Sequence, residues 1–242
     1  MKKYLEELLA ALNFAWGELF DFPAQLIFKN QPRCDEKNVF ILASFPLLGV
    51  LVGVLTALLG TLVASVFNKH AAGVVFAVVA WIILSFKDSG RGDGWLGNFF
   101  YDKLRDHENA EFIRNVLTIC PVLIKFAILL FVGLTGKYCF FAVQLGGAFA
   151  LQAALISSED SHVQFVPSNP RALTVFRVTL VVLALIAFIF CRVGTIGAIA
   201  AGTILYMICN RKLTGDGFTA ASVSRAGYIA EWVLLGVGLL LL

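Results

Sequence analysis

Charged residues are scarce in this sequence. Asp, Glu, Lys and Arg make up 14% of its 242 residues, whereas soluble proteins contain about 25%. Hydrophobic residues reach 59%, and apolar stretches recur from residue 39 to the C-terminus. A helix needs about 20 such residues to cross a bilayer. The alternating polarity of barrel strands, in segments of about 10 residues, is missing, so helices are the expected form of the spans.

Cysteine motifs and basic tracts are also lacking. The five cysteines are scattered without C-x-x-C spacing, which favours packing roles over metal binding or disulfides. The net charge is only +3, and the absence of a basic tract argues against a nucleic-acid partner. The N-terminal segment lacks a small-residue cleavage pattern and is expected to be retained. Three isolated histidines are assigned no ligand role: His70, His107 and His162.

The apolar stretches predict an all-α fold, a polytopic integral membrane helical bundle with about seven transmembrane spans. Residues 1–38 are predicted to be an amphipathic or re-entrant segment, because apolar residues recur at helical spacing from Leu5 to Phe20. Residues 39–242 are expected to form the bundle, and the whole chain one membrane domain. The predicted spans are 39–67, 71–86, 116–135, 138–157, 173–191, 193–210 and 227–242.

The distribution of Lys and Arg among the loops predicts the orientation. The segment before the first span and the loops 87–115, 158–172 and 211–226 together hold fourteen of these residues, whereas the intervening loops hold three. Because Lys and Arg favour the cytoplasmic side, the N-terminus and the first set of loops are expected in the cytoplasm. The predicted location is the inner, or cytoplasmic, membrane, with the lipid bilayer as a partner. The sequence leaves the oligomeric state open, and a homo-oligomer is one of the alternatives.

Two of these loops combine acids with glycines: "KDSGRGDGW" at 87–95 and "NRKLTGDGFTAASVSRAG" at 210–227. The carboxylates of Asp88, Asp93 and Asp216 would repel one another at close range unless a cation lies between them. When phosphate is the substrate, this cation is usually Mg²⁺. Both loops are expected on the same face, so we predict one shared site. An alternative is that charges and glycines are simply what a membrane protein places in its cytoplasmic turns.

Basic residues accompany the acids. Arg91, Arg211 and Lys212 are candidates for holding phosphate oxygens, Arg in bidentate fashion. Metal, phosphate clamps and flexible loops together are typical of a phosphoryl-transfer site. Charges inside predicted spans are costly and usually pair. The predicted spans contain three charged residues: Lys125, Arg177 and Glu231. Lys125 and Glu231 are a candidate ion pair, and for Glu231 both a structural role and a role in the site remain open.

The order of these elements resembles the cobalamin synthase family, that is, adenosylcobinamide-GDP ribazoletransferase. The similar parts are "LLAALNFAWGELFDFP" near the N-terminus, "FPLLGVLVGVLTALL" at 45–59, the aspartate-glycine loop after the second span, and "RKLTGDGFTAASVSRAGYIAEWVLL" at 211–235. The chain departs from the family in two places. Its first acidic loop has two aspartates where the family has three, and the family's D-S-R block before the third span is absent.

The resemblance implies a transferase of cobalamin biosynthesis with corrinoid and nucleotide substrates. The ribose of α-ribazole would attack the phosphate that joins cobinamide to GDP, and GMP would be released with Mg²⁺ assistance. On this view Asp88 and Asp93 hold metal, Asp216 holds a second metal or acts as base, and Arg91 and Arg211 brace the diphosphate. The remaining residues of the implied substrate site are Gly94, Lys212, Thr214, Gly215 and Glu231.

Two alternatives remain. A divergent phosphotransferase of the same fold would act on another nucleotide-activated substrate, and the altered acidic loop supports it. A non-enzymatic membrane transporter would place ionisable residues and broken helices near the middle of the membrane, whereas most acids of this chain lie in predicted loops.

Overall fold

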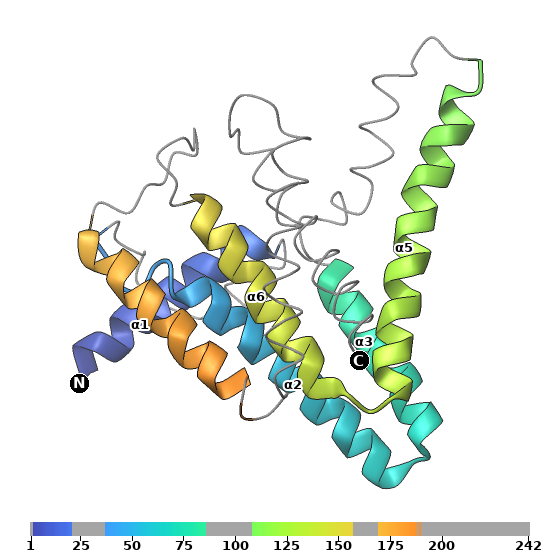
Figure 1. Cartoon of the computed structure of the whole chain (residues 1–242), viewed down its shortest axis with the longest axis horizontal. Helices are drawn as coiled ribbons and strands as arrows, with labels where there is room; N and C mark the ends of the chain where they lie inside the picture. Colours follow the sequence, from blue (N-terminus) through green and yellow to red (C-terminus); the bar gives the residue numbers. More distant parts are fainter. Residues whose placement is uncertain (1, 21–36, 86–107, 157–168, 188, 190–242) are drawn as a thin grey trace.

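The computed structural model describes residues 2–20, 37–85, 108–156, 169–187 and 189. Over these residues the protein is helical apart from short turns, as predicted (Figure 1). The labelled helices are α1 (Lys2–Leu19), α2 (Ser44–Val66), α3 (Lys69–Ser85), α5 (Ala110–Leu134) and α6 (Tyr138–Ile156). A further helix, Pro170–Ala187, is drawn in orange.

Three helices are long and apolar enough to cross a membrane: α2, α5 and the helix Pro170–Ala187. Helices α3 and α6 are also apolar but shorter. A row of leucines on the outer face of α2 is between 47% and 64% exposed, which suits lipid better than water. The row comprises Leu51, Leu55, Leu58 and Leu62. The membrane character of the chain is therefore supported by outward-facing apolar surface as well as by composition.

The first five predicted spans fall on α2, α3, α5, α6 and the helix Pro170–Ala187. The predicted spans 193–210 and 227–242 lie outside the described residues, so the total of seven stays a prediction. Helix α5 begins at Ala110, six residues before the predicted start at 116, because the helix continues beyond the apolar stretch.

Helices α2 and α6 pack against each other along Gly49 and Gly53 of α2, which we call the glycine seam. A Cβ atom on Gly49 would lie 2.7 Å from the carbonyl oxygen of Leu145, and one on Gly53 would collide with the backbone of Ala142. Small residues allow such close approach of helices in membranes, where packing replaces the hydrophobic driving force. The early part of α2 meets the late part of α6, so this pair is antiparallel.

Helices α3 and α5 form a second antiparallel pair. Gly73, near the start of α3, lies against the backbone of Gly133, near the end of α5. Further along, the rings of Trp81 and Phe126 meet edge to face with centroids 6.1 Å apart. Phe76 joins the two pairs, because its ring contacts Tyr138 at 4.8 Å and Phe141 at 5.6 Å on α6.

These pairings give the bundle two different ends. At the end that we call the polar end, α2 and α5 begin and α3 and α6 finish. Asn169 also lies there, because its side-chain amide donates a hydrogen bond to the carbonyl of Lys37 at 2.8 Å, just before α2. At the opposite end, which we call the turn end, short connections join α2 to α3 and α5 to α6. In the second of these, Gly136 has φ +69°, a conformation that favours glycine.

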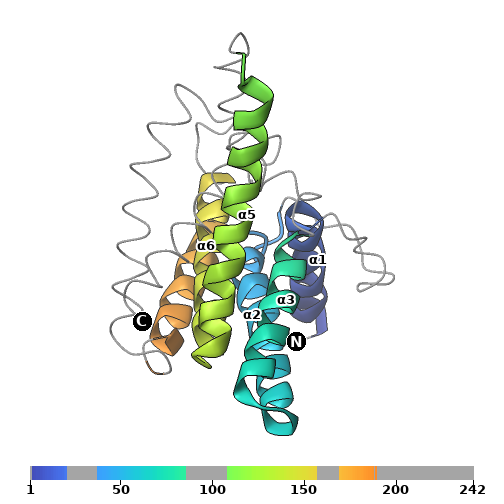
Figure 2. The same cartoon turned by 90° about the vertical axis from the view of Figure 1, so that its right-hand side faces the viewer.

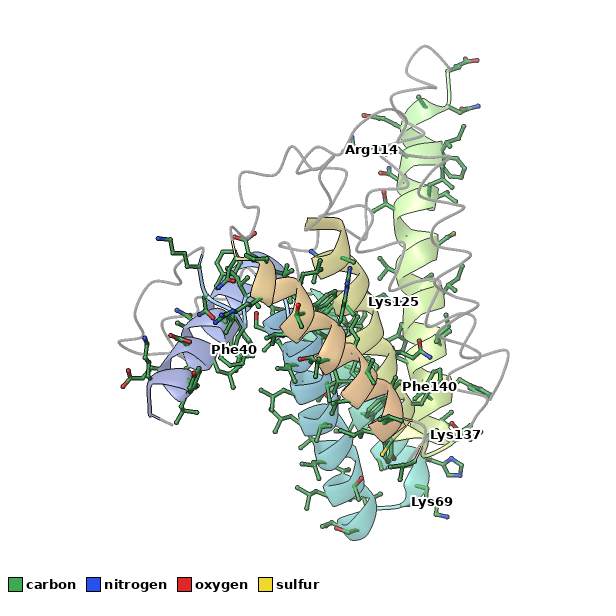
Figure 3. All side chains as sticks on the ribbon, turned by 60° about the vertical axis from the view of Figure 1, so that its left-hand side comes forward. Phe40, Lys69, Arg114, Lys125, Lys137 and Phe140 are labelled. Atoms are coloured by element: carbon green, nitrogen blue, oxygen red, sulfur yellow. The ribbon has the colours of Figure 1, made fainter. Side chains whose placement is uncertain are left out.

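The described cations near the ends of the bundle helices lie on the sides that the loop counts predict. Lys37, Arg114 and Arg171 lie toward the polar end, and Lys69 and Lys137 lie at the turn end; Figure 3 labels Arg114, Lys69 and Lys137. Which end faces the cytoplasm is a separate question and stays a prediction.

Helix α1 lies across the polar-end half of α2 and α6. Its buried face includes Ala11 and Ala15, and its ring of Phe14 meets that of Phe45 at 6.3 Å. Just after the helix, the Phe20 ring packs edge to face on Phe149 at 5.9 Å. The first turn of α1, residues 3–6, is exposed. The N-terminal segment is thus a helix with one buried face, and its location at a membrane interface stays a prediction.

Candidate functional site

The predicted site residues lie outside the part of the chain that the structure describes. Four of them fall in residues 86–107 and six in residues 190–242. They are Asp88, Arg91, Asp93 and Gly94 in the first segment, and Arg211, Lys212, Thr214, Gly215, Asp216 and Glu231 in the second. The predicted convergence of the two acidic loops, the Mg²⁺ site and the Lys125–Glu231 pair therefore remain predictions.

The structure does show where the first acidic segment is attached. It follows Ser85, the last residue of α3, and is followed by α5, which begins at Ala110. Both attachment points are on the polar-end side of the bundle, and Figure 1 shows α5 extending past the other labelled helices on this side. Asp88 is three residues from Ser85 in the chain.

Lys125 of α5 is the buried ion nearest to this attachment point. Its side chain is only 1% exposed, although the helix is apolar enough to cross a membrane. Figure 3 shows it inside the bundle, between the levels of Arg114 and Lys137. A buried ammonium group requires negative or strongly polar surroundings, because its transfer out of water costs several kcal/mol or more.

The helix pairing fixes the height of Lys125 in the bundle. Its neighbour in the chain, Phe126, contacts Trp81, so Lys125 lies about one helical turn from Ser85 at the end of α3. A helical side chain leans toward the N-terminus of its helix. For α5 this is the direction of the polar end, so the lysine side chain is directed toward the place where the first acidic segment starts.

Helix α6 contributes two buried amide side chains that the composition of the sequence does not reveal. Gln144 is 1% exposed and Gln152 is 7% exposed. Among the described residues, neither the oxygen nor the nitrogen of the Gln144 amide has a hydrogen-bond partner, and the same holds for the Gln152 oxygen and for the indole nitrogen of Trp81. Buried polar groups without partners each cost about 1–3 kcal/mol, so they are the most unusual feature of the described bundle.

Lys125, Gln144 and Trp81 come from three helices and share one level, which we call the polar layer. Phe76 packs between Tyr138 and Phe141. Trp81 is five residues after Phe76 on α3. Helix α6 runs in the same direction as α3, so the residue at the same level on α6 is about five residues after the Tyr138–Phe141 contact, near residue 144. The polar layer therefore lies directly above an apolar cluster that includes Phe76, Leu129 and Phe141.

Helices α5 and α6 diverge from their connection at the turn end. They are joined by the turn at Gly136 and are close together at the turn end, as Figures 1 and 2 both show. In Figure 1 the two helices then spread apart toward the polar end.

An apolar pocket lies between α2, α6 and the helix Pro170–Ala187. It has a volume of about 610 Å³ and is partly open. Its lining includes Val54, Leu58, Ala150 and Leu183. The hydroxyl of Thr61, also in the lining, donates a hydrogen bond to the Ala57 carbonyl at 2.9 Å and is thereby satisfied. The pocket suits an apolar group and offers no acid or base.

Within the described ranges, no group of three or more His, Cys, Asp or Glu side chains is arranged to hold a metal ion. The predicted Mg²⁺ ligands are all in the two acidic segments, so this finding leaves the prediction untested. Sequence reasoning had identified Lys125 as a charge within a span but had not identified Gln144 or Gln152. The sequence signal that could have identified the two glutamines is an amide side chain inside a long apolar stretch.

Compared with models of protein families, with curated proteins and with solved structures, the chain matches none of them.

Proposed function

We propose that this protein is a membrane-embedded, Mg²⁺-dependent phosphotransferase that joins α-ribazole, or its 5′-phosphate, to adenosylcobinamide-GDP with release of GMP. The observation that carries the proposal is the attachment of the first acidic segment at the polar end, about one helical turn from the buried Lys125. Phosphoryl transfer depends on electrostatic stabilisation, so an acidic segment that begins near a buried cation supports a site of this kind.

The resemblance to cobalamin synthases agrees with the packing of one of its most specific blocks. The "FPLLG" of residues 45–49 forms the first turns of α2, with Pro46 near the start, where a missing N–H is tolerated. Gly49 ends the block at a point where the backbone of α6 lies against α2. The block is thus explained by packing at the polar end, which supports a shared fold more directly than a shared activity.

The proposed roles follow the chemistry of the side chains. Asp88 and Asp93, with Asp216 from the second acidic segment, would bind Mg²⁺, which would neutralise charge on the phosphates. Arg91 and Arg211 would hold the diphosphate oxygens. With α-ribazole as acceptor, a ribose hydroxyl would form the new O–P bond, the bond between this phosphorus and the GMP oxygen would break, and Asp216 would take the hydroxyl proton.

Release of GMP tests this proposal directly. Purified protein in detergent would be supplied with adenosylcobinamide-GDP, α-ribazole and Mg²⁺, and GMP would be measured by chromatography. Asp93→Asn and Asp216→Asn should each reduce GMP release by ~1,000-fold or more, because each removes a charge that acts on the reacting phosphate. Glu6→Gln, at an exposed position of α1, is the control and should keep full activity.

Two results would count against the proposal. Activity like that of the wild type in either Asp variant would exclude the shared acidic site. A folded wild-type protein that releases no GMP would favour a divergent phosphotransferase with another nucleotide-activated substrate. A non-enzymatic transporter is the second candidate, favoured by the polar layer inside the bundle, and measured GMP release would exclude a purely transporting role.

A further inference from the structure

We infer that the apolar pocket between α2, α6 and the helix Pro170–Ala187 binds an anionic phospholipid, with an acyl chain in the pocket and the lipid phosphate at Arg177. The lipid comes from the membrane leaflet at the polar end, because Arg177 lies on that side of the pocket. This site is separate from the acidic segments of the proposed function and does not depend on them.

The first argument is the chemistry of the lining. The pocket has a volume of about 610 Å³, and its lining is apolar apart from the hydroxyl of Thr61 and the thiol of Cys139. The Thr61 hydroxyl already donates a hydrogen bond to the Ala57 carbonyl. The ligand of such a pocket is therefore apolar, and hydrocarbon chains are the apolar molecules that surround a helix in a bilayer.

The second argument is the shape of the pocket. On α2 its lining runs from Val50 to Thr61, eleven residues further along, which corresponds to about 16 Å of helix. One leaflet of the hydrocarbon core is about 15 Å thick, half of about 30 Å. Leu58 lines the pocket and also belongs to the outward-facing leucine row, with 54% of the residue exposed. The pocket is therefore long enough for one acyl chain and opens onto the surface that suits lipid.

The third argument is the exposure of Arg177 on an apolar surface. Its neighbours one turn away along the helix, Leu173 and Val181, are 39% and 60% exposed. Among the described residues, its guanidinium has no ion pair or hydrogen bond. A charge on a membrane-facing helix is costly and is retained where it meets a partner of opposite sign. A guanidinium binds phosphate oxygens in bidentate fashion, and phospholipid headgroups present phosphate at this kind of surface.

The fourth argument is the order of the charge and the pocket along the helix. Arg177 is three residues before Leu180 and seven before Ala184, which both line the pocket, so these residues are neighbours on one side of the helix. The helix begins at the polar end, and helical side chains lean toward the N-terminus. The guanidinium is thus directed toward the polar end, and the pocket extends from Leu180 toward the turn end. A phospholipid has its phosphate and its acyl chain in the same order.

Binding of phosphatidylglycerol to the purified full-length protein, measured by titration in native mass spectrometry, tests the inference. Arg177→Leu should weaken this binding by ~10-fold, because it removes a charged hydrogen bond, and should abolish the preference for phosphatidylglycerol over phosphatidylcholine. Ala184→Phe, which fills the pocket, should weaken the binding of both lipids. The control for charge is Arg171→Leu, on the opposite side of the helix from Leu180, and the control for size is Leu185→Phe, outside the lining. Both controls should bind like the wild type.

Two cysteines report where the lipid is bound. Cys139 lines the pocket and Cys120 lies on α5, and both are free and exposed. Saturating phosphatidylglycerol should slow the alkylation of Cys139 by N-ethylmaleimide by ~5-fold or more, because the reagent reaches only the unoccupied pocket. The alkylation of Cys120 should be unchanged. Mass spectrometry of the two peptides measures both rates in one sample.

Three outcomes would overturn the inference. It is wrong if phosphatidylglycerol does not slow the alkylation of Cys139, the result expected if another part of the chain fills the pocket. It is also wrong if Arg177→Leu binds phosphatidylglycerol as tightly as Arg171→Leu, or if the wild type has no preference for this lipid. Should Ala184→Phe fail to fold, as judged by size-exclusion chromatography, Arg177→Leu and the alkylation of Cys139 decide.

Discussion

The two faces of α6 differ in the way they are packed. Toward α2, glycines and alanines bring the backbones together, and the adjoining pocket is apolar. Away from this contact, the same helix buries Gln144 at the level of Lys125. Close packing of small residues stabilises a bundle in lipid, whereas buried amides without partners weaken it. The first face therefore reports on stability, and the second is the place to look for function.

The largest effect is expected at the glycine seam. Gly53→Leu should lower the free energy of unfolding by about 3 kcal/mol or more, because the side chain has no space beside the backbone of Ala142. Unfolding in mixed micelles measures this change. Gly17→Ala is the control, since nothing lies within 4 Å of a Cβ atom there, and it should be neutral or slightly stabilising. Equal stability of the two variants would show that α2 and α6 are not packed as described.

Two buried polar residues should respond in opposite directions. Gln144→Leu should raise the free energy of unfolding by ~1 kcal/mol, because it removes an amide without a partner. Thr56→Val should lower it by ~1 kcal/mol, since the Thr56 hydroxyl donates a hydrogen bond to the Val52 carbonyl at 2.8 Å. Thermal unfolding in detergent compares them. A clear loss of stability in Gln144→Leu would show that the glutamine has a structural role.

The smallest effect is expected in the apolar pocket. Ala150→Leu adds three carbon atoms to a pocket of about 610 Å³, so the free energy of unfolding should rise by less than about 1 kcal/mol. The same unfolding assay applies. A large loss of stability would mean that the space beside Ala150 is filled, and the contrast with Gly53→Leu would disappear.

Apolar length predicted the described helices well, because a span must be long and apolar whatever its partners are. Helix ends were predicted less well. Residues 37–43 form turns rather than helix, and the side-chain oxygen of Asn38 accepts a hydrogen bond from the backbone N–H of Phe40 at 2.9 Å. The fifth described span begins with Pro170, three residues before the predicted start at 173. Hydropathy does not register such local hydrogen bonds or the preference of proline for a first helical turn.

Helix pairing and the polar layer were beyond the reach of the sequence. The contact of Gly53 with Ala142 joins residues far apart in the chain, and no local pattern selects one partner among several apolar helices. Lys125 was recognised as a charge in a span, but its level beside Trp81 and Gln144 depends on the pairing of α3 with α5 and on the contacts of Phe76. The acidic residues of the proposed site stand out in the sequence, and their arrangement in space remains a prediction.

The hydrogen bond between Asn169 and Lys37 has a consequence for biosynthesis. Its partners are separated by 132 residues, so at about 5–20 residues per second the ribosome needs on the order of 10 s to supply the second one. The hairpin of α2 and α3 is complete long before that. The nascent chain therefore contains the α2–α3 connection early, whereas the Asn169 amide that donates to the carbonyl of Lys37 emerges only after α6.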